Sequence, residues 1–262
     1  MNKYLKNILL ITLSFVLLLS ILIFSVLWTY SNNIPDYKFL KNYKPPVSSK
    51  VYSGNGELVA DFSKEKRIFV PYNSIPKNVI NSFLSAEDKN FFSHPGVDAK
   101  GVLRAVINNI KNIMTSKRLE GASTITQQVA KILCLGSTYE KSNHSSETDF
   151  EKECRRNTIF RKLREIPFSI AMELKFTKDE ILMIYLNRVY LGAGNQGFEA
   201  ASIRYFDKSA KYLNPAESAM LAGLLVAPSY YAPTRNLNRA QQRATVVLDL
   251  MKKENYLTQE IV

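Results

Sequence analysis

The chain has 262 residues, of which 46% are hydrophobic and 22% are charged, and its formal net charge is +12 at neutral pH. This length is enough for one sizeable domain with at most a small additional segment. The composition is ordinary for a globular protein. The basic balance favours a partner that carries phosphate, which could be nucleic acid, anionic lipid or a phosphorylated substrate.

An uncharged apolar run occupies residues 8–28, close to the N-terminus. It is long enough for the ~20 residues that a membrane-spanning helix needs, whereas a secretory signal core has ~7–15 and ends in a small-residue cleavage site. Lys3 and Lys6 precede the run, so the positive-inside rule predicts a cytoplasmic N-terminus. The rest of the chain is then exported but tethered, which disfavours nucleic acid as a partner.

After the anchor, residues 32–46 are typical of a linker, and the following SSKVYSGNGELVADF alternates about Gly54-Asn55-Gly56, which predicts a small β-hairpin. Beyond Pro71 the pattern is helical, with a capping box predicted at Thr177 and another helix start at Asn214. The fold class is therefore mainly α. The expected organisation is a cytoplasmic N-terminus at 1–7, a transmembrane signal-anchor helix at 8–30, a linker and β-hairpin at 31–72, and a helical domain at 73–262 with a polar insert at about 134–155.

The stretch FLSAEDKNFFSHPG places a carboxylate on a helix face that should be buried. Apolar residues at helical spacing run from Ile80 to Phe91, and Glu87 lies among them beside Asp88. Burial disfavours the charged form of a carboxyl group and raises its pKa toward the range useful for proton transfer. The alternative is a helix-end carboxylate that turns toward solvent or pairs with Lys89.

Residues 121–131, GASTITQQVAK, predict the start of a helix that could receive a phosphate. Ser123 and the threonine after it are typical of a helix start, where free N–H groups and a partial positive charge favour anions. Gln127 and Lys131 are four residues apart and share a face, with Gln128 beside them. The alternative is a capped helix with a solvated lysine.

Residues 161–165, RKLRE, crowd two cations and a carboxylate onto one helical surface. Arg161 and Lys162 lie four and three residues before Glu165. One interpretation is a solvated ion pair, which contributes ~0.3–0.5 kcal/mol; the other is a pyrophosphate-binding cluster with a carboxylate inside it. Pro167 lacks an N–H group, so we expect it to kink this helix.

Together, EDKNFFSHPG, GASTITQQ, RKLRE and KDEILMIYLNRVYLGAGNQGFEAA resemble, in order and character, the motifs of the peptidoglycan glycosyltransferases. These are the polymerising domains of class A penicillin-binding proteins and the monofunctional transglycosylases. The resemblance runs from about Ser49 to the C-terminus. It implies a lysozyme-like helical domain and a membrane-anchored enzyme that polymerises lipid II.

The resemblance also implies roles for single residues. Glu87 would be the general base that takes the proton from the 4-hydroxyl of the acceptor sugar. Glu165 would act at the pyrophosphate leaving group, where a divalent cation such as Mg²⁺ or Mn²⁺ could assist, and no organic cofactor is implied. The implied substrate-binding residues are Asp88, Ser123, Gln127, Gln128, Lys131, Arg161 and Lys162.

The reaction implied is an inverting transfer. A base on one face of the sugar and a departing lipid pyrophosphate on the other would turn an α-linked donor into a β-1,4 glycan and release undecaprenyl pyrophosphate. The implied partners are lipid II, the growing lipid-linked glycan, the membrane and other cell-wall synthesis proteins. The implied location is the bacterial inner membrane, crossed once, with the catalytic domain on the outer side.

Residues 98–118 carry an apolar face surrounded by basic residues. Periodicity alone favours a core helix, whereas the family resemblance favours a segment that lies beside the bilayer. The two interpretations differ in whether the apolar face is covered by protein.

The polar insert at 134–155 is longer than the connection usual in the family. A basic residue normally found just before the RKxxE-like motif has no clean equivalent, and Arg155 and Arg156 are the candidates for its pyrophosphate contact. Cys134 and Cys154 are the chain's two cysteines, and in an exported domain they can pair in one way only. We predict a disulfide, with two free thiols as the alternative.

Two other functions fit parts of the pattern. A muramidase or lytic enzyme would use paired carboxylates on a similar scaffold to cleave glycan, but would leave the cations around Glu165 without a role. A non-catalytic membrane scaffold is the second. A transpeptidase half is not expected, since Ser63-x-x-Lys66 is not followed by SDN or KTG motifs. The sequence fits both a monofunctional enzyme and a truncated bifunctional protein.

Overall fold

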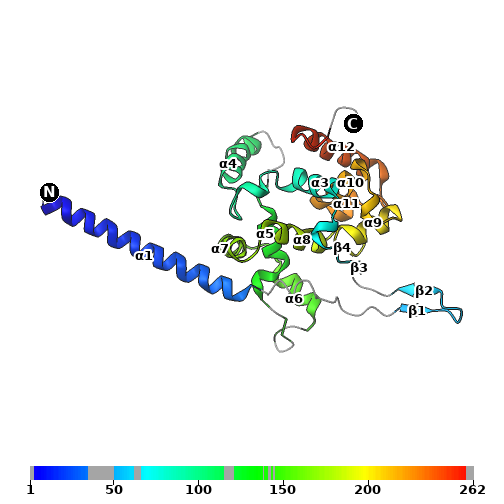
Figure 1. Ribbon diagram of the computed structural model, residues 1–262, viewed down its shortest axis with the longest axis horizontal. Coiled ribbons are helices and arrows are strands. Elements are labelled where there is room, and N and C mark those ends of the chain that lie inside the picture. The colour runs from blue at the N-terminus through cyan, green and yellow to red at the C-terminus, as the bar shows by residue number, and fades with distance from the viewer. Residues whose placement is uncertain are drawn as a thin grey trace.

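A computed structural model of the chain describes residues 3–34, 50–61, 66–114, 121–137, 139–140, 143 and 145–257. A long N-terminal helix, α1 (Lys3–Asn33), projects from a helical body (Figure 1). Within its Leu10–Asn32 segment, an 18-residue window has a mean hydropathy of 2.8 and none of that window is buried by the rest of the protein. By length and composition it is the one helix among the described residues that could cross a membrane.

Strands are few and short. β1 (Lys50–Tyr52) pairs antiparallel with β2 (Leu58–Asp61), with an irregularity in register after Val51. β3 (Lys66–Arg67) pairs in parallel with β4 (Asn195–Gln196), so the start of the helical body is joined to a segment far along the chain. Most of the linker predicted over residues 32–46 lies outside the described residues.

Helices make up the rest of the body (Figure 1). The capping box predicted at Thr177 and the helix start predicted at Asn214 are confirmed, and Asn214 and Thr124 also form capping boxes. The helices are α3 (Lys77–Glu87), α4 (Ala99–Met114), α5 (Ile125–Ile132), α6 (Glu147–Cys154), α7 (Ile159–Lys175), α8 (Lys178–Arg188), α9 (Phe198–Phe206), α10 (Pro215–Gly223), α11 (Pro228–Tyr231) and α12 (Leu237–Lys253).

The core is built around α8, whose residues from Ile181 to Asn187 are all buried. α5 packs between α7 and α8, and α10 packs against α3 and α12. The rings of Phe83 on α3 and Tyr185 on α8 meet edge to face, with their centroids 6.5 Å apart. This packing brings the end of α3, the length of α5 and the first half of α7 to one side of α8.

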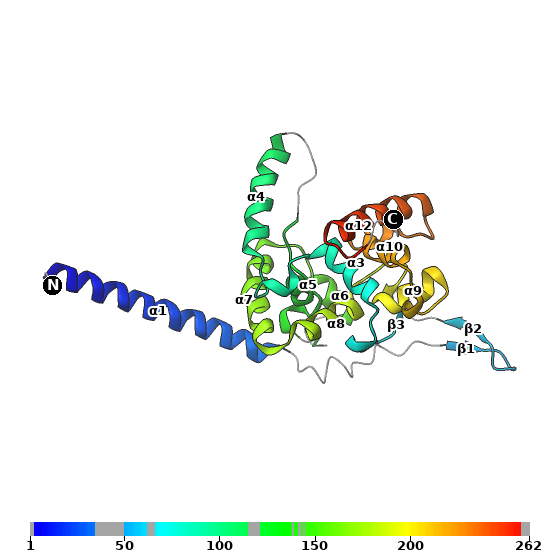
Figure 2. The ribbon, with the colours of Figure 1, turned by 45° about the horizontal axis from the view of Figure 1, so that its top comes forward.

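The apolar face of α4 is not part of this core. Leu103 and Ile113 are 63% and 69% exposed, and α4 rises away from the body in Figure 2. The core helix that periodicity favours for residues 98–118 is therefore wrong for the described part of that segment, because only the small Gly101 and Ala105 are buried there. Residues 115–118 lie outside the described residues.

Candidate functional site

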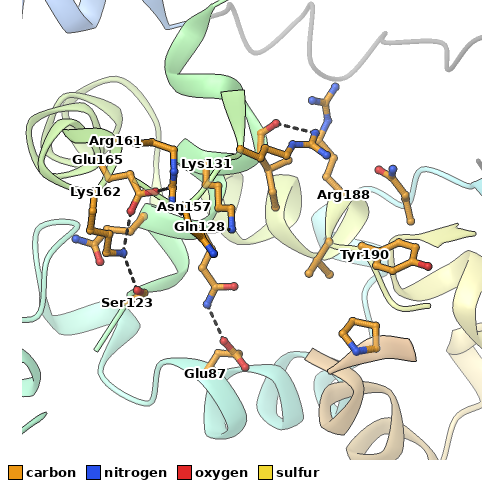
Figure 3. A pocket seen from close by; sticks show the side chains of 16 residues that line it. Glu87, Ser123, Gln128, Lys131, Asn157, Arg161, Lys162, Glu165, Arg188 and Tyr190 are labelled. Atoms are coloured by element: carbon orange, nitrogen blue, oxygen red, sulfur yellow. Dashed lines mark hydrogen bonds and ion pairs between the residues drawn. The ribbon is translucent and has the colours of Figure 1, made fainter. Parts of the chain in front are cut away.

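A cleft of about 570 Å³ opens where α3, α5 and α7 meet (Figure 3). It gathers side chains from motifs that are far apart in the sequence. The predicted site residues that line it are Glu87, Ser123, Gln127, Gln128, Lys131, Arg155, Arg161, Lys162 and Glu165.

Glu87 occupies one end of the cleft, at the last residue of α3. Its Oε2 atom accepts a hydrogen bond of 2.7 Å from Nε2 of Gln128 on α5. Burial raises the pKa of Glu87, the Gln128 hydrogen bond and the charge of Arg243 lower it, and the charge of Asp88 raises it; burial is the largest effect and the pKa is raised overall. The group is therefore poised to hold or accept a proton.

A hydrogen bond from Tyr185 fixes the orientation of the Gln128 amide. The hydroxyl of Tyr185 donates to Gln128 Oε1 at 3.1 Å, so the amide must present its N–H to Glu87. Burial and the negative charges of Glu87 and Asp88 raise the pKa of Tyr185 well above its usual value. Tyr185 therefore remains a neutral donor, and we call Glu87, Gln128 and Tyr185 the base end of the cleft.

Asp88 points away from this cleft and is buried. Its Oδ2 atom accepts from the backbone N–H of Ile125, the first residue of α5, at 2.9 Å, and both carboxylate oxygens lie 3.1 Å from Nε2 of His94. A carboxylate suits the positive N-terminus of a helix. Asp88 thus ties the end of α3 to the start of α5, and its side chain borders a second cleft of about 390 Å³.

Glu165 lies at the other end of the cleft and is only 1% exposed. It forms an ion pair with Arg161, and its Oε2 atom is 2.8 Å from Nζ of Lys162. Lys162 also donates to Ser123 Oγ at 2.7 Å, which links α7 to the segment before α5. α7 continues through Pro167 to Lys175, so the helical spacing holds across the expected kink.

Lys131 joins this group from the last turn of α5. Asn157, which the sequence did not single out, accepts from Lys131 Nζ at 3.4 Å and from an Arg161 NH2 group at 3.0 Å. Burial first, and then neighbouring cations, lower the pKa values of Lys131 and Lys162, and burial lowers that of Arg161. We call these three side chains the cation cluster: Lys131, Arg161 and Lys162. An anion bound among them would stabilise their charged forms.

The two arginines proposed for the pyrophosphate contact, Arg155 and Arg156, lie in different places. Arg155 lines the cleft and donates to the carbonyl of Ile132 and to Glu151, both at 3.1 Å. Arg156 is exposed and borders another recess, and its carbonyl oxygen accepts from Nε of Arg161 at 2.7 Å. The segment before α7 therefore contributes one side chain to the cleft and one backbone contact to the cation cluster.

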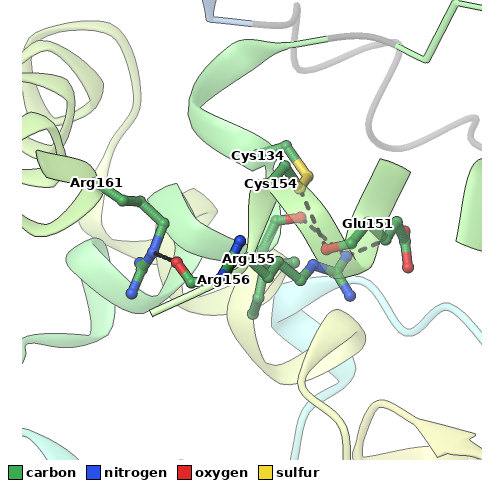
Figure 4. The surroundings of a disulfide bond; sticks show 7 residues. Cys134, Glu151, Cys154, Arg155, Arg156 and Arg161 are labelled. Atoms are coloured by element: carbon green, nitrogen blue, oxygen red, sulfur yellow. Dashed lines mark hydrogen bonds and ion pairs between the residues drawn. A yellow bond between two sulfur atoms is a disulfide. The ribbon is translucent and has the colours of Figure 1, made fainter. Parts of the chain in front are cut away.

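A disulfide joins Cys134 and Cys154 immediately before this arginine pair (Figure 4). It fastens the end of α6 to the turn that follows α5. The two cysteines lie near the ends of the predicted insert, of which residues 138, 141, 142 and 144 lie outside the described part.

Three further lining residues belong to the quoted motif KDEILMIYLNRVYLGAGNQGFEAA, but the sequence analysis gave them no role. Arg188 lines the cleft from the last residue of α8, and Tyr190 and Gln196 line it from the segment that follows. That segment turns back at Gly197, which has a φ of +83°, and a Cβ atom there would lie 2.6 Å from the carbonyl oxygen of Asn187. The GAGNQG run could have indicated this tight return.

Gln127 shows a second difference between pattern and structure. Its side-chain Oε1 accepts from the backbone N–H of Thr124 at 3.1 Å and its own N–H bonds the Thr124 hydroxyl, which makes the capping box of α5. The side chain lines the cleft, but its carbonyl oxygen serves the helix start.

The described side chains do not form a metal cage. No group of three His, Cys, Asp or Glu residues among them could hold a metal ion. Glu165 is the carboxylate at the basic end, and a divalent cation bound there would compete with Arg161 and Lys162 for its oxygens.

Comparisons with known proteins found relatives that cover the helical body and its cleft. The family model described as Transglycosylase covers residues 55–252. Penicillin-binding protein 1A of Rickettsia prowazekii (strain Madrid E) is 40% identical over 90% of this chain, and those of Aquifex aeolicus (strain VF5) and Escherichia coli (strain K12) are 39% and 34% identical over 87% and 98% of it. The matched region is 28% of each of these relatives, so the chain spans little more than a quarter of their length.

Among solved structures, the crystal structure of penicillin-binding protein 1A from Haemophilus influenzae matches with 21% identity and a TM-score of 0.44. The match covers 83% of this chain and 20% of that one.

Proposed function

The chain belongs to the transglycosylase family, and from that premise we propose that it is a membrane-anchored peptidoglycan glycosyltransferase that polymerises lipid II. One observation carries the proposal: a single cleft holds a carboxyl group with a raised pKa at one end and a carboxylate inside a cation cluster at the other. Glycosyl transfer from a lipid diphosphate needs these two environments together.

At the base end, Glu87 would accept the proton of the acceptor sugar's 4-hydroxyl. The raised pKa makes it a stronger base than a solvated carboxylate, and the hydrogen bond from Gln128 stabilises its ionised form before the reaction. The oxygen that loses the proton would attack the anomeric carbon of the donor.

At the opposite end, the donor's diphosphate would lie against the cation cluster. As the glycosidic C–O bond breaks, negative charge moves onto the diphosphate, and preorganised Lys131, Arg161 and Lys162 would stabilise it. Attack from the side opposite the leaving group inverts the anomeric centre, so an α-linked donor gives a β-1,4 glycan and undecaprenyl diphosphate. Glu165, paired with two of these cations, would hold them in place.

The proposed placement follows from α1. This helix would cross the bacterial cell membrane once with the N-terminus in the cytoplasm, and the domain at 73–262 would stand on the outer side, where lipid II and the growing lipid-linked glycan are held. Other cell-wall synthesis proteins are the expected protein partners.

The test is incubation of the full chain, in lipid vesicles, with lipid II and separately with finished glycan strands. Growth of glycan from lipid II supports the proposal. Shortening of the finished strands would favour a lytic enzyme, and no change in either substrate would favour a non-catalytic scaffold.

A chelator arm tests the predicted cation. A fall in rate that Mg²⁺ or Mn²⁺ restores would assign a metal to the substrate's diphosphate beside Glu165, and an unchanged rate would assign the leaving group to the protein cations alone.

A further inference from the structure

We propose that the disulfide between Cys134 and Cys154 is a positioning element for the leaving-group end of the cleft. It holds residues 154–157, here called the strap, against the end of α5, and the strap in turn keeps Lys131 and Arg161 in place for a diphosphate. The inference gives the disulfide a part in the reaction beyond stability, and it rests on the role proposed above for the cation cluster.

The strap contacts both helices that carry the cation cluster (Figure 4). On one side, the guanidinium of Arg155 donates to the carbonyl of Ile132, the last residue of α5, at 3.1 Å. On the other side, the carbonyl oxygen of Arg156 accepts from Nε of Arg161 on α7 at 2.7 Å. The position of the strap therefore depends on α5, and the direction of the Arg161 side chain depends on the strap.

Asn157 joins the two helices through a single atom (Figure 3). Its Oδ1 accepts from Nζ of Lys131 on α5 at 3.4 Å and from an NH2 group of Arg161 on α7 at 3.0 Å. The charge of Arg161 lowers the pKa of Lys131, so the two cations repel each other. A neutral acceptor shared by both fixes their separation, and the strap decides where that acceptor lies.

The strap has little other support from the core. Among the residues from 145 to 158 whose exposure the structure describes, none is buried. A segment with few buried contacts opens at a low cost in free energy. The disulfide compensates for this, because it ties Cys154 at the start of the strap to Cys134, which is only 6% exposed. At its other end the strap runs into Thr158, the N-cap of α7.

The turn at the other cysteine also needs to be held. Cys134 and Leu135 have φ angles of 52° and 53°, in the left-handed region that favours glycine. Side-chain-bearing residues keep such a conformation only where their surroundings enforce it. Lys131 lies in the last turn of α5, directly before this turn. Opening the disulfide is therefore expected to loosen the strap and the end of α5 together.

The effect should be confined to one end of the cleft. The base end depends on the hydrogen bonds from Tyr185 to Gln128 and from Gln128 to Glu87, and these bonds involve no residue of the strap. With the disulfide open, we expect weaker binding of a diphosphate and an unchanged base.

The test is calorimetric titration of the full chain, in detergent micelles, with inorganic diphosphate before and after treatment with dithiothreitol. The two thiols of the reagent open the S–S bond, so that each cysteine becomes a thiol and the reagent closes to its own cyclic disulfide. Reduction should raise the dissociation constant by roughly tenfold, because the cations lose their fixed geometry. A Cys134→Ser, Cys154→Ser variant should bind like the reduced chain, with or without the reagent.

A second variant tests the strap while the disulfide is intact. Asn157→Ala removes the acceptor between Lys131 and Arg161, so it should weaken diphosphate binding by the oxidised chain, and reduction should then add little. The matched control is Asn143→Ala, at an exposed position in the insert where the amide donates to Glu140. This control should keep both the parent's affinity and its response to the reagent.

Equal affinities of the folded oxidised and reduced chains would overturn the proposal. So would loss of the whole fold on reduction, monitored by circular dichroism, because the disulfide would then support the domain and not the strap. Unchanged binding by Asn157→Ala would also reject it. An oxidised parent that does not bind diphosphate would reject the cation cluster as well, whereas redox-dependent binding without polymerisation would reject only the proposed function.

A kinetic measurement separates positioning from general loosening. With lipid II as substrate, reduction should lower kcat/KM by roughly tenfold and leave the acidic limb of the pH–rate profile in place, because the strap does not contact Glu87. A limb that moves on reduction would assign the loss to the fold as a whole.

Discussion

The two ends of the cleft use burial in opposite ways. At the base end, burial acts on one acid and raises the pKa of Glu87. At the other end it acts on bases that crowd one another and lowers the pKa values of Lys131 and Lys162. In both places burial disfavours the charged form of the side chain. The proposed reaction would neutralise each charge, by a proton at Glu87 and by a diphosphate at the cation cluster.

The ends also differ in how they are fixed. The base end is a short chain of hydrogen bonds from two neutral donors, Tyr185 and Gln128, and Tyr185 is fully buried in the core around α8. The cation cluster is joined by ion pairs and by the Asn157 amide, on segments next to solvent and close to a disulfide. Variants at the two ends should therefore fail in different ways.

The largest effect is expected at the base itself. Glu87→Gln keeps the shape of the side chain but cannot accept the proton, so polymerisation should fall by roughly 10²–10⁴-fold. The measurement is the initial rate of lipid II consumption, with circular dichroism to show that folding is retained. Asp249→Asn on the exposed face of α12 is the control. A Glu87→Gln rate like that of this control would remove Glu87 from the mechanism.

At the cation cluster, Lys162→Gln should lower the rate by about 10²-fold, because one preorganised donor to the developing charge is lost. The loss should appear in kcat, and Lys162→Arg should recover part of it. Lys152→Gln on α6, whose ammonium is highly exposed, should behave like the wild type. A rate that is insensitive to charge at residue 162 would mean that the diphosphate binds elsewhere.

The third prediction concerns the disulfide between Cys134 and Cys154, which lies close to the cation cluster. It closes a loop with a sequence separation of 20 residues, and its removal in a Cys134→Ser, Cys154→Ser variant should lower the free energy of unfolding by about 3 kcal/mol. Thermal unfolding with and without reductant measures this. Reductant should destabilise the parent chain and leave the double variant unchanged; equal sensitivity of both would contradict a stabilising disulfide.

The smallest effect is expected in the pH dependence of the rate, which tests the hydrogen bonds at the base end. In its proposed role as the base Glu87 must be ionised, so the rate should fall as pH falls through its raised pKa. Gln128→Leu removes a hydrogen bond that lowers this pKa, so the acidic limb of the profile should move to higher pH and the rate near neutrality should drop by roughly tenfold.

Tyr185→Phe should shift the same limb in the same direction by less, because the Gln128 amide loses only its fixed orientation. An acidic limb that moves to lower pH in either variant would show that the amide does not stabilise the ionised carboxylate.

Much of this protein could be predicted from its sequence because the signals are local. An uncharged run of apolar residues determines α1, and Thr177 and Asn214 determine helix starts through hydrogen bonds that span three residues. The spacing of Arg161, Lys162 and Glu165 places them on one face of any helix, whatever surrounds it. Motif order was enough to indicate the family.

Other features depend on contacts between distant segments, which no local pattern contains. Periodicity cannot tell whether an apolar face meets protein or lipid, so the exposed face of α4 required the packed body. The turn of Asp88 away from Glu87, the use of Gln127 as a helix cap and the bridging position of Asn157 were decided by which helices meet. Residue types determined the available chemistry, and tertiary packing decided which groups share one cleft.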